Sequence, residues 1–576
     1  MTQNPTVSPA GAPAGIQPLV FERDVAIAMA DGTVLRANVW RPEAPGRYPV
    51  VMAMGIYGKD EHFEDAFGAQ WRVLTQTYPG LTKDGSTGHY LRWENVDPER
   101  WVPDGYAVVT VDSRGSGKSP GYLDPFSATE THDFYEAIEW AGTQPWCNGK
   151  VGLIGVSYFA MKQWQVAALR PPHLAAIVPW EGASDFYRDG GHHGGIFSNG
   201  FTYAWWPRQV LVNQHGSGDS PYRDRDTGER TTGPALPPAL LPTNRADHPN
   251  DRLSHPLDDA WQREHSPRLD RIEVPLLSAA NWGGPGMHLR GNVEGYLQAG
   301  SQQKWLFAHV GTHYESFYLP HYVALQKRFF DRFLKDEKNG WDDEPPVQLA
   351  IRQADGTAML RKEHEWPLAR TSWTPFHLDA QAMSLSPDGG AGPSMPSAQA
   401  SYAGADGSVS FSTAPFVQDT EFTGPAALRL WVSSSTTDMD IFAVLRLVDP
   451  QGQEAVFIGA HEKVPAAVGW LRASHRKLDA ARSQPYRPWH THDEVQKLTP
   501  GEAVPVDVEI WPTSIVCPAG WRLVLTVQGH DFVPDGPGRL RHNHPVDRPA
   551  AEFGGSNTLH TGGPHEAFLL LPLIPA

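Results

Sequence analysis

The sequence predicts an α/β fold built on a parallel sheet, followed by a region made of β-strands. Short apolar runs at 48–55, at the start of 106–121 and at 151–154 alternate with segments whose apolar residues have helical spacing. Such runs are typical of parallel strands that helices cover on both faces. From about residue 370 the chain changes to short alternating segments separated by Gly, Pro and Asp, which favours an antiparallel sandwich.

The elements of the α/β region follow one another in a regular order. A hairpin is predicted over 25–42, because apolar and polar residues alternate on both sides of an Asp-Gly turn signal. Helical spacing predicts a helix over 133–144, and a strand follows at 151–157. A second helix at 159–170 leads to another strand at 174–180. The order is that of repeated βαβ units.

The regular alternation stops after Asp185 and resumes near residue 271. The segment between them is rich in His, Gly, Pro, Arg and Asp and is predicted to be an insertion. Strands are then expected at 274–282 and 304–313, and an amphipathic helix at 321–337. The predicted division is a disordered leader (1–20), a core in two pieces (21–185 and 271–370), an inserted segment (186–270) and a β-rich region (371–576).

Composition excludes several classes of function. The 576 residues carry a formal charge of −17 without a Lys/Arg cluster, so nucleic-acid binding is not expected. No apolar run is long enough for a membrane span, and the N-terminal segment has no signal-peptide pattern. Cys147 and Cys517 are the two cysteines, which excludes a disulfide framework. We therefore expect a soluble cytoplasmic protein.

Ser157 is the candidate nucleophile. It follows an apolar strand and Gly155 and precedes a helix, as in a strand–turn–helix elbow that exposes a serine hydroxyl beside backbone N–H groups. Phe159 stands where the G-x-S-x-G pattern has its second glycine, so the motif is matched only in part. The alternative interpretation is an ordinary loop serine.

A histidine base and a carboxylate are expected to follow in the chain. His313 comes just after the last predicted strand of the parallel series, the position of the base in this chemistry, whereas His309 lies within that strand. No Asp or Glu occurs between Ser278 and Arg290, where the acid is expected. Carboxylates on neighbouring strand ends remain available, with Glu181 favoured and two alternatives left open, which are Asp185 and Glu294.

Two further motifs are weighed and rejected. Gly117-Lys118-Ser119 resembles part of a phosphate-binding loop, but Pro120 opposes the helix that such a loop needs. Histidines gather at 192–193, 490–494 and 542–544, without an H-E-x-x-H helix or paired cysteines. The sequence therefore predicts neither a cofactor nor a metal site.

The stretch "WCNGKVGLIGVSYFAMKQWQVAALRPPHLAAIVP" resembles the nucleophile region of the cocaine esterase and X-prolyl dipeptidyl-peptidase family, the CocE/NonD hydrolases. Further similar stretches are "DGTVLRANVWRP", "VDSRGSGKSPG", "FFDRFLKDE" and "FTGPAALRLWVSSSTTDMDIFAVL". The resemblance covers nearly the whole chain. It implies an α/β-hydrolase core, a helical cap inserted after the sixth strand, and a C-terminal jelly roll of the galactose-binding-like type.

The resemblance also implies roles for individual residues. Ser157 matches the nucleophile and His313 the general base, and Tyr57 matches a tyrosine whose hydroxyl forms the oxyanion hole with the backbone N–H of Tyr158. Two positions depart from the family pattern. Ala160 replaces a common glycine, and Gly284 stands where the family has its acid.

The function expected from these observations is a serine hydrolase that cleaves an ester or amide, either an acyl ester or an Xaa-Pro-type peptide, through an acyl-enzyme. The partner would be a small-molecule substrate, and a homodimer is compatible with the chain although no segment marks an interface. The altered acid position leaves a second reading open, a catalytically degenerate hydrolase fold that acts as a binding protein. A metal-dependent hydrolase is the third.

Overall fold

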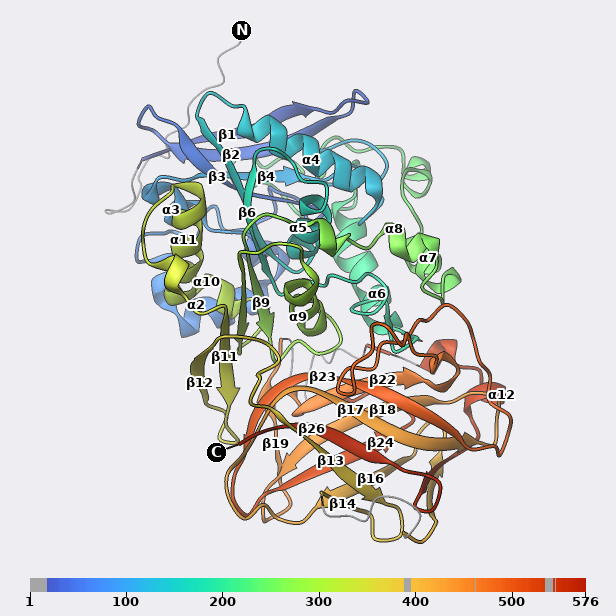
Figure 1. The fold of residues 1–576 in the computed structure, drawn as a ribbon. Helices are drawn as coiled ribbons and strands as arrows, with labels where there is room; N and C mark the ends of the chain where they lie inside the picture. Colours follow the sequence, from blue (N-terminus) through green and yellow to red (C-terminus); the bar gives the residue numbers. More distant parts are fainter. Residues whose placement is uncertain (1–17, 388–394, 461–462, 534–541, 544, 576) are drawn as a thin grey trace.

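The computed structural model describes residues 18–387, 395–460, 463–533, 542–543 and 545–575. Most of the predicted leader, 1–20, lies outside the described residues, and strand β1 (Leu19–Ala28) begins at its end. Figure 1 shows two bodies, one in which helices surround a sheet and one made almost entirely of strands, with the chain passing once from the first to the second.

The first body is organised by one mixed sheet. Its strands lie in the order β1, β2, β4, β3, β5, β6, β9, β10, β11, β12. Their bounds are β2 (Val34–Pro42), β3 (Tyr48–Gly55), β4 (Ala107–Asp112), β5 (Cys147–Val156), β6 (Leu174–Trp180), β9 (Leu276–Asn281), β10 (Lys304–His309), β11 (Val347–Arg352) and β12 (Ala358–Glu363). In this order, every pair of adjacent strands from β4 through β11 is parallel, as the apolar runs predicted.

Helices cover both faces of this sheet (Figure 1). The longer ones are α4 (Ala128–Gly142), α5 (Tyr158–Ala167), α9 (Leu289–Gln298) and α11 (Pro320–Leu334), and the shorter ones are α1 (Phe63–Ala66), α2 (Gly68–Thr77), α3 (Pro98–Trp101) and α10 (Glu315–Tyr318). Successive residues of β3 point into different hydrophobic clusters, with Val51 in one and Val50 and Met52 in the other. Burial on both faces explains why this strand is continuously apolar.

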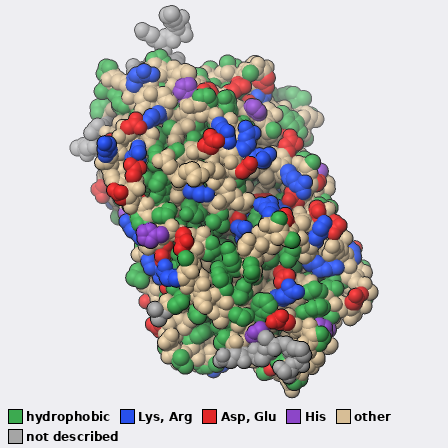
Figure 2. All heavy atoms as spheres, viewed as in Figure 1, with side chains coloured by type: hydrophobic (Ala, Val, Ile, Leu, Met, Phe, Trp, Pro, Cys, Tyr) green, Lys and Arg blue, Asp and Glu red, His purple; other side chains and the backbone are tan. Residues whose placement is uncertain are grey.

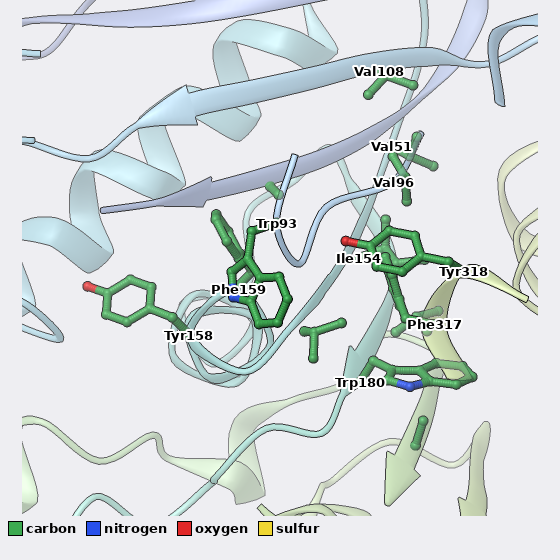
Figure 3. Close-up of a cluster of buried hydrophobic side chains, with 14 of the residues drawn as sticks. Val51, Trp93, Val96, Val108, Ile154, Tyr158, Phe159, Trp180, Phe317 and Tyr318 are labelled. Carbon is green, nitrogen blue, oxygen red and sulfur yellow. The ribbon is translucent and has the colours of Figure 1, made fainter. Parts of the chain in front are cut away.

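An aromatic-rich cluster fills one side of the sheet and reaches the strand ends (Figure 3). Phe159 packs there against Gly55, at which a Cβ atom would lie 2.5 Å from the Phe159 ring. In Figure 3 the ring of Tyr158 points away from the other labelled side chains. Its hydroxyl donates to the buried carboxylate of Glu130 on α4. These contacts fix the start of α5, where the predicted nucleophile lies.

The insertion between β6 and β9 consists of short elements. They are β7 (His192–His193), β8 (Ile196–Phe197), α6 (Asn199–Trp205), a π-helical turn (Trp206–Val210), α7 (His248–Ser254) and α8 (Ala260–Glu264), with further single turns between them. The buried side chains of Phe186, Trp205 and Trp206 belong to the same cluster as the sheet residues. The insertion therefore packs directly on the core near the carboxyl ends of the strands.

The second body is formed mainly by antiparallel strands around its own hydrophobic core. Its longer strands are β13 (Ser372–Asp379), β15 (Ala398–Ala403), β16 (Ser408–Thr413), β17 (Thr420–Ser434), β18 (Asp440–Val448), β22 (Ala467–Arg472), β23 (Val504–Cys517), β24 (Arg522–Gln528), β25 (Ser556–Thr561) and β26 (Phe568–Ile574). The shorter elements are β14 (Ser384–Ser386), β19 (Glu454–Ala455), β20 (Phe457–Ile458), β21 (Lys463–Val464) and helix α12 (Ala550–Phe553). The expected change to an all-β region is confirmed.

The visible surface carries charged side chains of both signs (Figure 2). On the face shown in Figure 2, basic and acidic side chains are interspersed rather than gathered into patches of one sign. Across the described ranges, no helix combines the length and the apolar character that crossing a bilayer requires.

Candidate active site

Ser157 occupies a sharp turn between β5 and α5. Its backbone has φ 57° and ψ −114°, a conformation that is strained for a residue with a side chain. The Ser157 N–H donates to the carbonyls of Trp180 and Glu181, at 3.1 Å each, which holds the turn against the end of β6. Gly155 is required beside it, because a Cβ there would lie 2.5 Å from Cβ of Phe159. The predicted elbow is present.

The hydroxyl of Ser157 meets a histidine that sequence reasoning did not name. Its Oγ lies 3.1 Å from Nε2 of His288, and both side chains are buried. His288 lies in the loop between β9 and α9, where the sequence pattern predicted the acid of the site. The strand order identifies this loop as part of the site, but a histidine there is not the residue type that the pattern calls for.

His313 lies after β10, where the strand pattern predicted a catalytic histidine, and is held between two carboxylates. Its Nδ1 is 2.8 Å from Oε2 of Glu181, and its Nε2 is 2.9 Å from Oε1 of Glu94. Burial by itself lowers the pKa of His313, but the charges and hydrogen bonds of these two carboxylates outweigh it and raise the pKa to about 10. His313 is therefore protonated at neutral pH.

The two histidine rings form one compact group. The ring of His313 lies parallel to that of His288, with 5.0 Å between centroids and 7° between planes. Burial raises the pKa of Glu94, and its contact with His313 opposes that rise. Ligand atoms of Glu181, His288 and His313 all lie within 4.8 Å of one another, so these side chains could also ligate a metal ion.

The carboxylate of Glu181 reaches His313 because β6, β9 and β10 are adjacent and parallel, so their ends share one edge of the sheet. Asn281, at the end of β9, donates to Oε1 of Glu181 at 3.2 Å and fixes its orientation. Like Ser157, Glu181 and Glu94 have positive φ, 51° and 62°. Backbone strain at all three positions marks a region whose geometry the surrounding packing imposes.

The two other carboxylates considered for the acid lie with arginines. Asp185 accepts a hydrogen bond from Arg188 at 3.0 Å, and Glu294 accepts one from Arg487 at 2.8 Å. Of the three candidates, Glu181 is thus the one brought to His313. The sequence offered no signal for Glu94, which lies 219 positions from its partner His313.

Tyr57 and Tyr158, the two residues that the resemblance assigned to the oxyanion hole, lie near each other, with 5.7 Å between their ring centroids. Tyr57 follows β3, and its hydroxyl oxygen accepts a hydrogen bond from Nε1 of Trp205 at 2.9 Å. Tyr158 is the first residue of α5, where backbone N–H groups have no acceptor within the helix. Both residues line the same pocket as Ser157 and His288. A hydroxyl donor and an N–H donor are therefore available at one place.

This pocket lies between the core and the insertion and encloses about 480 Å³, part of it open to solvent. Most of its lining is aromatic or apolar. The remaining lining residues are Phe126, Met161, Ala183, Gly190, Phe201, Thr202, Trp205, His248, Arg252 and Met287.

The β-rich body also reaches the site. The N–H of His313 donates to the carbonyl of Ala460 at 2.8 Å, and the N–H of Ala460 donates to the carbonyl of Gly283 at 2.6 Å. Gly283 leaves room for this approach, because a Cβ at that position would lie 2.5 Å from the carbonyl oxygen of Ile458. A segment far along the chain thus braces the loops that carry both histidines.

Comparison with known proteins places this geometry in a family. Residues 31–315 match the X-Pro dipeptidyl-peptidase (S15 family) model, and residues 339–570 match the X-Pro dipeptidyl-peptidase C-terminal non-catalytic domain. The cocaine esterase of Rhodococcus sp. (strain MB1 Bresler) is 26% identical over 96% of this chain and 98% of its own. An α-amino acid ester hydrolase shares the fold, with a TM-score of 0.67 and 16% identity over 100% of this chain and 99% of its own.

A CocE/NonD family hydrolase from Staphylococcus aureus is more similar in both sequence and structure. Its crystal structure has a TM-score of 0.85 and 35% identity, with 97% of this chain and 94% of that chain covered. The match thus includes both bodies of the fold. The chain belongs to the CocE/NonD family of hydrolases and is a serine hydrolase.

Proposed function

We propose that this enzyme cleaves an ester or amide bond through an acyl-enzyme formed on Ser157. The observation that carries the proposal is the hydroxyl of Ser157, held on a strained elbow at the pocket wall and 3.1 Å from an imidazole nitrogen. A serine becomes nucleophilic when an adjacent base accepts its proton. Its oxygen attacks the substrate carbonyl, the leaving group departs with a proton, and water then hydrolyses the acyl-enzyme by the same route.

His288 accepts the proton of Ser157 in this proposal, because its Nε2 is the ring nitrogen in contact with the hydroxyl. The sequence assigned this step to His313, whose two ring nitrogens lie 2.8 and 2.9 Å from carboxylate oxygens. A His313 that is already protonated is a poor acceptor. In this proposal His313 stays protonated between Glu181 and Glu94, and its ring lies beside the His288 ring on which the new positive charge forms.

Glu181 replaces the acid that the family pattern places at Gly284. Its carboxylate, together with that of Glu94, supplies negative charge next to the two histidines. When Ser157 gives up its proton, a second positive ring forms on His288. The two carboxylates balance these two rings inside a buried site, where an uncompensated charge is costly.

The oxyanion of the tetrahedral intermediate would be bound by Tyr57 and by the N–H of Tyr158. Trp205 donates to the oxygen of Tyr57, which leaves the phenolic proton to point toward another acceptor. Burial raises the pKa of Tyr57 well above its usual value, so the phenol keeps this proton at neutral pH. Each such donor is typically worth about 2.7–4 kcal/mol in the transition state.

We also propose that the first body is an α/β-hydrolase core with an inserted cap and that the second is a jelly roll. The strand order β1, β2, β4, β3, β5, β6, β9, β10, with the nucleophile after β5 and a histidine after β10, supports an α/β-hydrolase core with an inserted cap. The antiparallel pairing of β17 with β23 and of β18 with β24 supports a C-terminal jelly roll.

The test is intact mass after incubation with a fluorophosphonate, followed over time in the wild type and in Ser157→Ala, His288→Gln and His313→Gln. We expect one adduct in the wild type and none in Ser157→Ala. His288→Gln should slow labelling by about 10²–10⁴, the usual contribution of a positioned base. Labelling that survives His288→Gln but is lost in His313→Gln would return the proton transfer to His313. A folded wild type without an adduct would favour the binding-protein reading.

A further inference from the structure

Arg252 is a charged side chain inside the pocket that the proposed reaction leaves without a role. It lies on α7 in the insertion and lines the same pocket as Ser157, Tyr57 and His288. Only 6% of its surface is exposed. A guanidinium is retained at such a position either because it is paired within the protein or because it meets something that binds there.

Within the part of the chain that the structure describes, Arg252 has no carboxylate within ion-pair distance. Its Nη1 donates to the carbonyl of Gly190 at 3.2 Å, and its Nε has no hydrogen-bond partner among the described residues. The guanidinium carbon lies 4.0 Å from the ring centroid of Phe186, a cation–π contact. A carbonyl and an aromatic face leave most of its five donors available to a ligand.

Other buried arginines show how the protein usually treats such groups. Arg290 pairs with Asp189 and Glu509, at 2.9 Å each, and Arg188 pairs with Asp185 and Asp258. Arg352 has no carboxylate partner, but it donates to three oxygen atoms of its surroundings. Arg252 therefore differs from these arginines, and the difference lies at the pocket.

The charge of Arg252 persists despite its burial. Burial lowers the pKa of Arg252 to about 9, so the group remains protonated at neutral pH. The neighbouring His248 does not add a second charge, because burial and the nearby arginine hold its pKa well below the usual value. The described residues that line the pocket include no aspartate or glutamate. The pocket thus presents one positive group on an apolar wall.

We propose that Arg252 binds a carboxylate of the substrate, so that the enzyme acts on esters or amides with an apolar body and a negatively charged end. This inference rests on the proposed function, since it places the carboxylate in the pocket of Ser157. Arginine binds carboxylates through two parallel N–H donors, which fixes the orientation of a bound group as well as its charge. The apolar lining, including Phe126, Phe201 and Trp205, would contact the body of the substrate.

The same residues argue against a substrate with a free amine. An ammonium group needs a carboxylate anchor, and the nearby acids are already engaged. Asp189 accepts from Arg290 and from the N–H groups of Ser184 and Asp185. A cation in the pocket would instead be repelled by Arg252.

The experiment compares substrates that differ only in charge. One pair is 4-nitrophenyl hydrogen suberate and 4-nitrophenyl methyl suberate, with the carboxylate on the acyl side. The other pair is the acetate ester of 4-hydroxyphenylacetic acid and of its methyl ester, with the carboxylate on the leaving group. We expect kcat/KM to favour the acid over the methyl ester by about 10- to 100-fold in at least one pair, as a charge-assisted hydrogen bond predicts.

The variants test whether Arg252 causes this preference. Arg252→Met should bring the ratio in the preferred pair close to one, mainly through KM, and Arg252→Lys should retain part of it. The matched control is Arg263→Gln, which removes a charge from an exposed side chain of the neighbouring α8. This control should keep the wild-type ratio. Equal rates for acid and methyl ester in both wild-type pairs would overturn the inference.

Two measurements distinguish a failure of the role of Arg252 from a failure of the proposed function. Fluorophosphonate labelling of Ser157 reports the proposed function directly, so a labelled wild type with charge-independent rates refutes only the role of Arg252. An unlabelled, folded wild type refutes the proposed function itself. If Arg252→Met does not fold, inhibition of the wild type by octanoate and by the uncharged octanamide decides the question. Stronger inhibition by octanoate is expected, and equal inhibition would count against the carboxylate site.

Discussion

The hydroxyl of Tyr57 can be removed with almost no change in shape, which makes Tyr57→Phe a direct test of the oxyanion site. Its oxygen accepts the hydrogen bond from Nε1 of Trp205 at 2.9 Å, and the side chain is 9% exposed. Loss of one oxyanion donor typically costs about 2.7–4 kcal/mol, so kcat should fall by about 10²–10³. KM should change little, because the donor acts mainly in the transition state.

The same substitution has a separate cost in stability. The buried N–H of Trp205 loses its acceptor, which typically costs about 1–3 kcal/mol in the free energy of unfolding. This loss is too small to unfold a protein of ordinary stability, so the two effects can be measured apart. Urea unfolding followed by tryptophan fluorescence gives the stability, and steady-state hydrolysis of a 4-nitrophenyl ester gives kcat and KM.

Tyr158→Phe is the matched control for this test. It removes the hydroxyl of the neighbouring tyrosine, which donates to Glu130 at 2.7 and 2.8 Å, and leaves the backbone N–H in place. A comparable loss of stability is expected, with a decrease in kcat of less than about tenfold. If Tyr57→Phe retains kcat within threefold of the wild type, Tyr57 has no place in the oxyanion site and the reasoning is refuted.

Two further predictions concern the supports of the site. Gly283→Ala places a Cβ 2.5 Å from the carbonyl oxygen of Ile458, so the free energy of unfolding should fall by about 1–3 kcal/mol in a urea titration. Gly68→Ala is the control: a Cβ there meets open space, so the same titration should show no loss of stability. Because the folded pKa of His313, about 10, lies above the usual 6.5, its proton stabilises the fold at low pH, and this contribution is lost as the pH rises toward 10. Unfolding at pH 8, 9 and 10 should show a decline of up to about 1.4 kcal/mol per pH unit, and Glu94→Gln should flatten it. Equal declines in both proteins would contradict the second prediction.

Local pattern was sufficient for those parts of the site that neighbours along the chain create. The apolar run of β5, Gly155 and the helix after it predicted the elbow of Ser157, because strand burial, a crowded turn and helix initiation are local properties. The ends of parallel strands also favoured Glu181 over Asp185 and Glu294 as the carboxylate that meets His313. That expectation used only the rule that such ends share one edge of a sheet.

Other parts of the site depend on contacts that no local pattern encodes. His288 reaches Ser157 because the loop after β9 folds back over the elbow, and Glu94 reaches His313 across 219 positions of sequence. The division into two bodies was visible in the sequence, because near residue 370 the pattern changes to short alternating segments separated by Gly, Pro and Asp. The contact of Ala460 with the loop of His313 was not, because it depends on how the two bodies dock.

By itself, then, the sequence determined the succession of strands and helices, the nucleophilic elbow and the family resemblance, since these follow from periodicity and from motifs of adjacent residues. Only the tertiary structure decided which histidine contacts Ser157 and which carboxylates contact His313. It also placed Arg252 in the pocket of Ser157, where no carboxylate of the described residues pairs with it. The physical reason is that charge and hydrogen bonding act between side chains that are close in space. Packing of the whole chain brings those side chains together, and the order of residues along it does not reveal which ones will meet.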